Sequence, residues 1–113
     1  MNTHYSKASL IEIADGDEDF MSIVVHIFLE EIPPDIEALT EAIKNDNKEL
    51  AYQFIHKIKP NIEMFGIGVQ YEIKRIETWT RSTNTDNAIQ ESIDALNQVL
   101  YCVFDELKID FPK

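Results

Sequence analysis

Three residue types that interrupt or crosslink chains are scarce in this sequence. Its 113 residues include one cysteine, three glycines and four prolines. A lone cysteine, Cys102, excludes an internal disulfide and a cysteine-rich zinc site. Few glycines and prolines favour long, regular elements, because these residues most often break helices and strands. The length predicts a single domain, 1–113, and a hydrophobic content of 44% is enough for a core.

Positive charge is also scarce. Ten Lys and Arg stand against 21 Asp and Glu, which gives a formal net charge of −11. Nucleic acids and anionic membranes attract basic surfaces, so we expect neither as a partner. No apolar run approaches the roughly 20 residues that span a bilayer. The N-terminal segment lacks the apolar core of a secretion signal, so we expect a cytoplasmic protein.

Apolar residues recur at helical spacing along most of the chain, and no segment alternates with the period of a strand. The pattern predicts helices near 7–14, 17–45 (bent or interrupted at Pro33-Pro34), 47–65, 69–82 and 86–108. Four long helices with short connections predict an all-α fold. We expect an antiparallel up-down-up-down four-helix bundle with a short extra N-terminal helix.

Local signals mark several helix ends. The run Asp15-Gly16-Asp17 marks the start of the first long helix, with acidic residues in its first turn. Asp46 and Glu49 have the spacing of a capping box for the next helix. Gly66 and Gly68 bracket a tight turn after that helix.

Motifs for catalysis on small molecules are missing. The sequence contains no phosphate-binding loop, no dinucleotide fingerprint and no nucleophile elbow. Di-metal four-helix bundles use Glu-x-x-His, but Gln53 stands three residues before His56 and Ile23 three before His26. We therefore expect no cofactor, no resident metal and no enzymatic activity.

Two of the three histidines have ordinary explanations. His4 falls in an N-terminal segment that we expect to be loose and solvated. His26 projects away from the apolar stripe, toward Ser22 and Glu30, as an ordinary surface or half-buried residue does.

His56 points away from the predicted core. The apolar stripe of its helix covers about 140°, and His56 lies about 160° from the centre of that arc. Lys59, one turn later, can bring an ammonium group beside the imidazole. Pro60 cannot donate a hydrogen bond to the His56 carbonyl, so the helix should bend there. The spacing is compatible with an incidental surface histidine or with a nucleophile that accepts a phosphoryl group.

The run FIHKIKP at 54–60, continued to Gly66, resembles the signature of histidine-containing phosphotransfer (HPt) domains. Those domains carry a lysine three residues after the histidine, a small residue or proline four after it, and a glycine ten after it. Here these positions are His56, Lys59, Pro60 and Gly66. The resemblance covers about residues 10–80 and includes Gly16-Asp17, Phe20, Phe28, Leu39, Ala42, Asp46, Leu50, Ile73 and Ile76-Glu77.

The resemblance implies that His56 accepts a phosphoryl group, on Nε2, from an aspartyl phosphate and passes it to another aspartate. The partners would be response-regulator receiver domains or a hybrid sensor histidine kinase. Lys59 would contact the phosphoryl group, and the receiver would supply Mg²⁺. The chain would then be a carrier without a cofactor of its own, and we expect a monomer.

The expected rim of the site consists of Gln53, Lys57, Pro60, Glu63 and Gly66. Glu63 departs from the family pattern, which often has a small residue at this position. Its charge either opposes the phosphorylated form or pairs with Lys59 four residues earlier. An alternative function therefore stays open, a transfer-defective bundle that acts as a receiver-binding or adaptor module.

The first long helix has more apolar surface than one contact needs, over an arc of about 240°. Its main stripe consists of Phe20, Ile23, Val24, Ile27 and Phe28. Beyond that stripe lie Met21, Val25 and Leu29. These three residues either pack against the N-terminal and last helices or form a docking patch for a receiver.

Overall fold

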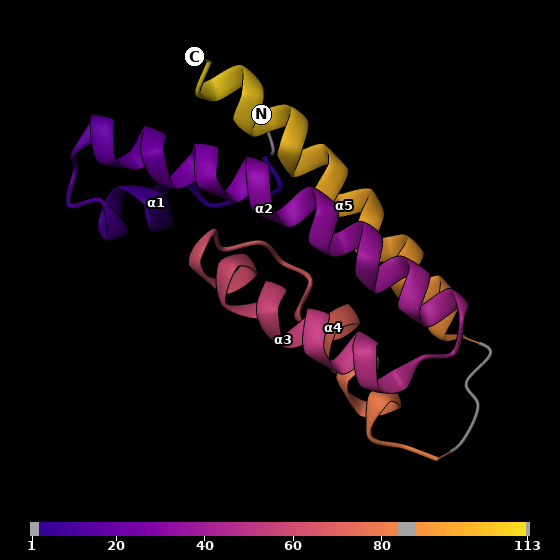
Figure 1. The fold of residues 1–113 in the computed structure, drawn as a ribbon. Helices are drawn as coiled ribbons and strands as arrows, with labels where there is room; N and C mark the ends of the chain where they lie inside the picture. Colours follow the sequence, from indigo (N-terminus) through magenta and orange to yellow (C-terminus); the bar gives the residue numbers. More distant parts are fainter. Residues whose placement is uncertain (1–2, 84–87, 113) are drawn as a thin grey trace.

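The computed structural model describes residues 3–83 and 88–112, and within that part of the chain every regular element is a helix (Figure 1). The helices are α1 (Lys7–Ile13), α2 (Glu18–Lys44), α3 (Lys48–Met64), α4 (Gln70–Thr80) and α5 (Ile89–Asp110). The all-helical prediction is confirmed, with helix ends within two residues of those predicted. The exception is the expected start of the last helix at residue 86, which lies outside the described residues.

Helix α2 begins as the sequence predicts and is not interrupted. The Asp17 side chain accepts hydrogen bonds from the backbone N–H groups of Asp19 and Phe20, at 3.0 and 3.1 Å. Pro33 and Pro34 lie inside the helix, which continues past them to Lys44. The face of α2 therefore keeps one helical phase from end to end.

The cap of α3 differs from the prediction by one residue. Asn47, and not Asp46, is the N-cap, and its side chain accepts a hydrogen bond from the Leu50 N–H at 3.1 Å. Asp46 has a φ of 56° and forms the turn between α2 and α3. Asp is one of the few residues besides Gly that adopt this conformation. Asp46 therefore forms the turn, and the next residue, Asn47, caps α3.

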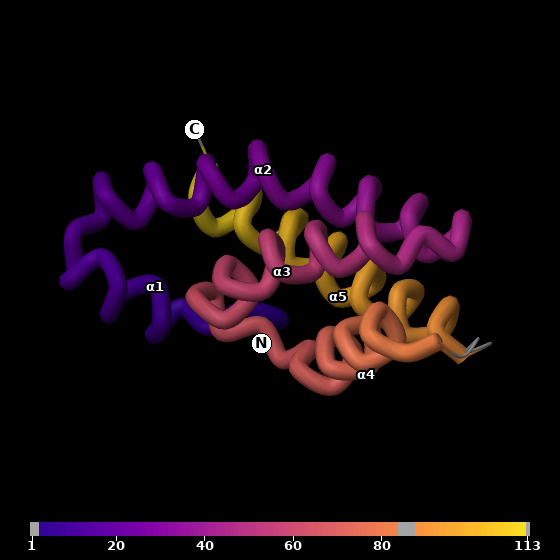
Figure 2. Tube along the Cα trace, turned by 60° about the horizontal axis from the view of Figure 1, so that its bottom comes forward, coloured from indigo at the N-terminus to yellow at the C-terminus, as the bar shows by residue number. Residues whose placement is uncertain are grey.

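The four long helices form a closed ring of contacts. Helix α2 packs against α3 and α5, and α4 packs against the same two helices. Helix α1 packs against α2 and α3 at one end of the ring (Figure 2). No helix in the described ranges has both the length and the apolar character needed to cross a membrane.

The side of α2 that faces the core differs from the main apolar stripe expected from the sequence, which was Phe20, Ile23, Val24, Ile27 and Phe28. Met21 and Val25 are buried, at 6% and 0% exposure, and Leu29 packs against the core. Of the main stripe, Phe28 is buried, whereas the exposed apolar residues of α2 are Phe20, Ile23 and Ile27. The docking patch proposed for Met21, Val25 and Leu29 is therefore wrong, and the alternative, that they pack inside the protein, is correct.

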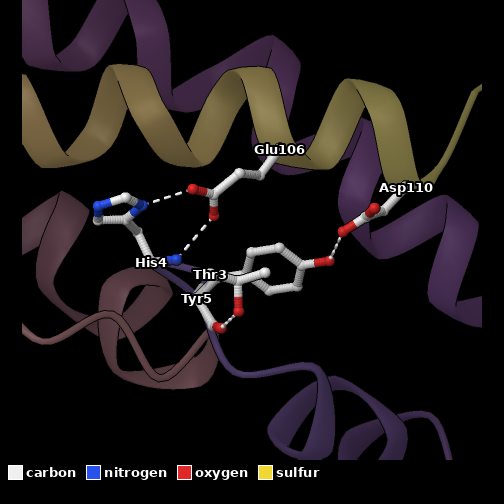
Figure 3. Close-up of polar contacts among 5 residues, drawn as sticks. All are labelled: Thr3, His4, Tyr5, Glu106 and Asp110. Atoms are coloured by element: carbon white, nitrogen blue, oxygen red, sulfur yellow. Dashed lines mark hydrogen bonds and ion pairs between the residues drawn. The ribbon is translucent and has the colours of Figure 1, made fainter. Parts of the chain in front are cut away.

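The N-terminal segment is tied to the bundle. Figure 3 shows His4 bonded to the Glu106 carboxylate through both its backbone N–H and Nδ1, and the Tyr5 hydroxyl donating to Asp110. Tyr5 is 4% exposed. The Ser6 N–H donates to the Phe65 carbonyl at 2.8 Å. The segment therefore joins the end of α3 to the end of α5, and the expectation that His4 lies in a loose terminus is wrong.

Candidate functional site

His56 lies on the exposed side of α3, as the sequence predicts. Its side chain is 52% exposed. The ring stacks at a tilt on Tyr52, one turn earlier, with 4.3 Å between the ring centroids. Tyr52 covers one side of the imidazole, so the ring is held in place while much of its surface stays open to a partner.

A carboxylate from α4 joins His56 to Lys59. The Lys59 Nζ lies 3.3 and 3.2 Å from the two carboxylate oxygens of Glu77, and the His56 Nε2 lies 3.9 Å from Oε2. The Glu77 side chain is 11% exposed and that of Lys59 is 39% exposed. A carboxylate so far removed from water is stabilised by the ammonium partner. The charged group nearest to the imidazole is thus the Glu77 carboxylate, and Lys59 pairs with that carboxylate.

The second lysine near the histidine faces the other way. The Lys57 Nζ lies 3.1 Å from Oδ1 of Asp35 on α2, a carboxylate that is itself buried. Successive helical positions diverge by about 100°, so Lys57 reaches α2 while Lys59 reaches α4. Lys57 therefore fixes α3 to α2 and does not extend the charge beside His56.

Three rim residues are at the surface. Gln53, Pro60 and Glu63 are exposed residues of α3. Of the two arrangements considered for Glu63, pairing with Lys59 is not observed among the described residues, and the carboxylate that Lys59 contacts is that of Glu77. Glu63 lies seven residues after His56, two turns further along the same side of the helix.

Gly66 has a structural role and does not border the site. Its φ is 62°, and a Cβ built there would lie 2.5 Å from the Ser6 Cβ. The glycine thus provides both the turn after α3 and the space for the N-terminal segment. It lies ten residues from His56, about 15 Å along a helix. Its assignment to the rim of the site is corrected accordingly.

Glu77 and Asp35 carry the two acidic contacts near His56, and the sequence pattern does not predict either of them. The available signal was the apolar spacing of α4, in which Ile73, Ile76 and Thr80 repeat on one face. Glu77 interrupts that face with a carboxylate, and Ile73 and Ile76 are buried as expected. An acidic residue at a core-facing position needs a cationic partner, which the spacing alone does not identify.

His26 is an ordinary half-buried residue, as the sequence predicts. It is half-buried on α2, with Nδ1 3.4 Å from the Ser22 hydroxyl. Among residues 3–83 and 88–112, no group of three or more His, Cys, Asp or Glu is placed to hold a metal ion.

Comparison of the chain with protein-family models, with curated proteins and with solved structures gave no match in any of the three.

Proposed function

We propose that this protein is a phosphocarrier in a multistep His–Asp phosphorelay, with His56 as the acceptor of the phosphoryl group. The observation that carries the proposal is an exposed imidazole beside a lysine that a buried carboxylate holds in place. Together with the sequence resemblance, this arrangement favours a protein that is modified by its partners. The protein would carry the phosphoryl group and would not act as an enzyme.

The proposal includes the antiparallel course of the four long helices. It is supported by the closed ring of contacts among α2, α3, α4 and α5. The connection at 45–47 between α2 and α3 is short, as in antiparallel helix pairs. In this arrangement α3 presents His56 on the outside of the bundle, between the flanks of α2 and α4.

The proposed step is a reversible transfer between nitrogen and oxygen. A lone pair on one ring nitrogen of His56, Nε2 by the resemblance, attacks the phosphorus of an aspartyl phosphate. The P–N bond forms while the P–O bond to the aspartyl carboxylate breaks, and the carboxylate leaves with the electron pair. Transfer to a second aspartate reverses these bond changes. An imidazole is suited to this role because, when uncharged, one of its ring nitrogens carries a lone pair that can attack phosphorus.

Lys59 balances the charge that arrives with the phosphoryl group. Its ammonium contacts the same Glu77 oxygen that lies nearest to Nε2 of His56. A phosphoryl group on that nitrogen would bring negative charge toward Glu77. The lysine can donate hydrogen bonds to both anions, because an ammonium group has three N–H donors.

The partners in this proposal are receiver domains or a hybrid sensor histidine kinase in the cytoplasm. They would provide the aspartyl phosphate and the Mg²⁺ that accompanies it. The carrier would be a monomer and would supply the nucleophile and the lysine.

A second candidate function follows from Glu63. Its carboxylate is exposed on the side of α3 that carries His56, and Lys59 is engaged elsewhere. An unneutralised anion at this position would repel a phosphoryl group. The protein would then bind receivers without accepting phosphate, as an adaptor module.

The test is incubation of the full chain with phosphorylated receiver domains from the same genome. We expect uptake of an acid-labile, base-stable phosphate by the wild type and none by His56→Gln. Lys59→Ala should slow uptake by about tenfold, equivalent to about 1.4 kcal/mol in the barrier.

Glu63→Gln separates the two candidate functions, because it removes the charge and keeps the size. Efficient transfer by the wild type, little changed in this variant, excludes the adaptor. A wild type that takes up no phosphate from any receiver contradicts the carrier proposal, and labelling of His56→Gln contradicts the assigned site.

A further inference from the structure

The N-terminal half of α2 exposes a row of large apolar side chains. Phe20, Ile23 and Ile27 are 46%, 55% and 49% exposed. Their spacing of three and four residues places them on one side of the helix. We call these three residues the α2 stripe.

The stripe lies on the outward-facing side of α2, since Glu30, Pro34 and Glu41, in the same helical phase further along, are exposed as well. Phe28 stacks on Phe65, the C-cap of α3, with 4.1 Å between the ring centroids. Residues 18–27 of α2 precede this contact, and Figures 1 and 2 both show that end of α2 extending past α3 with α1 beside it. Helix α1 covers the core side of this segment and leaves the α2 stripe without a neighbouring helix.

The surroundings of the α2 stripe are strongly acidic. Residues 7–31 contain seven Asp and Glu and one Lys, and all seven acids are exposed. On a helical projection Asp19 and Glu30 flank one edge of the stripe and Glu31 flanks the other. An apolar strip with acidic edges is complementary to a surface of the same shape with basic edges.

We propose that the α2 stripe is a docking surface for an amphipathic helix of a partner protein, with an apolar face edged by lysine and arginine. A second copy of this chain fits poorly, because it would place acidic edges against acidic edges. An anionic membrane is disfavoured for the same reason. The partner helix would lie along the outward-facing side of the N-terminal half of α2.

This surface is separate from the site on α3, and the inference does not depend on phosphotransfer. The contact between Asp35 and Lys57 marks the level of His56 along α2. Ile27 and Phe20 precede Asp35 by 8 and 15 residues, about 12 and 22 Å along the helix. A helix seated on the stripe would leave the imidazole accessible.

The test uses a synthetic amphipathic peptide as the probe, with leucine on one face and lysine at its edges. The full chain is titrated with this peptide, and backbone amide and histidine ring NMR signals are followed. We expect the largest shifts in the first half of α2, unchanged His56 ring signals, and no binding of the matching leucine–glutamate peptide.

Serine substitutions distinguish docking from attraction by charge alone. Ile23→Ser with Ile27→Ser keeps the charge of the protein and should weaken binding at least tenfold. Ile109→Ser is the matched control, because Ile109 is exposed (76%) and lies on α5, and it should bind as the wild type does. The single variant Ile23→Ser, expected to weaken binding severalfold, serves if the double variant does not fold.

Three results would overturn the proposal. One is equal binding of the peptide by the wild type and the serine variants. Another is a shift pattern centred on His56 or on any surface other than α2. The third is a dimer of the wild type that the serine variants abolish, which would make a second copy the occupant.

Discussion

Glu77 is the residue on which the geometry around His56 depends most. It is almost fully removed from water, and it fixes Lys59 by two contacts of 3.3 and 3.2 Å. The exposed imidazole and Lys59 could be predicted from their spacing, since both follow from the helical repeat. Their connection through α4 could not, because it depends on which helix packs beside α3.

Removing the ammonium should destabilise the fold. Lys59→Met leaves the Glu77 carboxylate without its cationic partner, and we expect the free energy of unfolding to fall by about 1–3 kcal/mol. Lys74→Met, at an exposed lysine of α4, should change it by less than about 0.5 kcal/mol. Urea unfolding measures both variants.

A double-mutant cycle checks the cause. Lys59→Met combined with Glu77→Gln should cost less than the sum of the two single changes, because the uncompensated carboxylate is gone. Additive effects would show that the two side chains are not coupled.

At the residue scale, the three glycines differ in how much an added Cβ should destabilise the fold. A Cβ at Gly68 meets nothing within 4 Å, and at Gly16 it meets nothing but the φ is 76°. At Gly66 a positive φ of 62° coincides with a 2.5 Å approach to Ser6. Alanine should therefore be nearly neutral at Gly68, cost about 1 kcal/mol at Gly16, and cost more at Gly66. Thermal unfolding gives the order, and equal effects at Gly66 and Gly68 would contradict the role assigned to Gly66.

At the scale of elements, α2 shows what a sequence pattern determines and what it leaves open. Its length and cap could be predicted, but its core face was assigned wrongly because apolar residues cover two adjoining sides. The helix passes through Pro33 and Pro34 without interruption. Residues 28, 32, 36, 39 and 43 are all buried, and their phase continues back to Val25 and Met21. The sequence predicts a bend or an interruption at the prolines, and the continuity of phase across them identifies the core face.

The N-terminal segment depends on a buried phenol. Burial, and then the hydrogen bond to Asp110, raise the pKa of Tyr5 above its usual range, with the charges of Asp110 and Glu106 acting in the same direction. The folded state therefore favours the protonated phenol. This contribution to stability is complete below the unfolded-state value of about 10 and is lost as the pH rises above it.

Tyr5→Phe tests this linkage. Near pH 8 the variant should be less stable by about 1 kcal/mol, the value of one hydrogen bond. Toward pH 11 the wild type should lose stability more steeply than the variant, so the difference narrows or reverses. Parallel pH profiles would exclude Tyr5 as the titrating group.

At the scale of the whole molecule, the charges that add up to −11 are unevenly distributed. The two lysines beside His56 are both engaged by buried carboxylates, and the end formed by α1 and α2 carries exposed acids.

Self-repulsion of such a chain opposes the compact state, and salt screens exposed charges more than buried pairs. Raising NaCl from about 10 to about 200 mM should therefore raise the Tm. About 1 kcal/mol of relieved repulsion corresponds to roughly 4–8 °C. A falling Tm would mean that exposed ion pairs outweigh the repulsion.

The most direct measurement of the central claim is to locate the phosphoryl group after transfer. The full chain is incubated with a phosphorylated receiver, digested at alkaline pH to preserve a P–N bond, and analysed by mass spectrometry. The account predicts one phosphoryl group on the peptide that contains His56, and its loss when a second, unphosphorylated receiver is added. Modification at His4 or His26, or a chain that stays unmodified with every receiver, would contradict it.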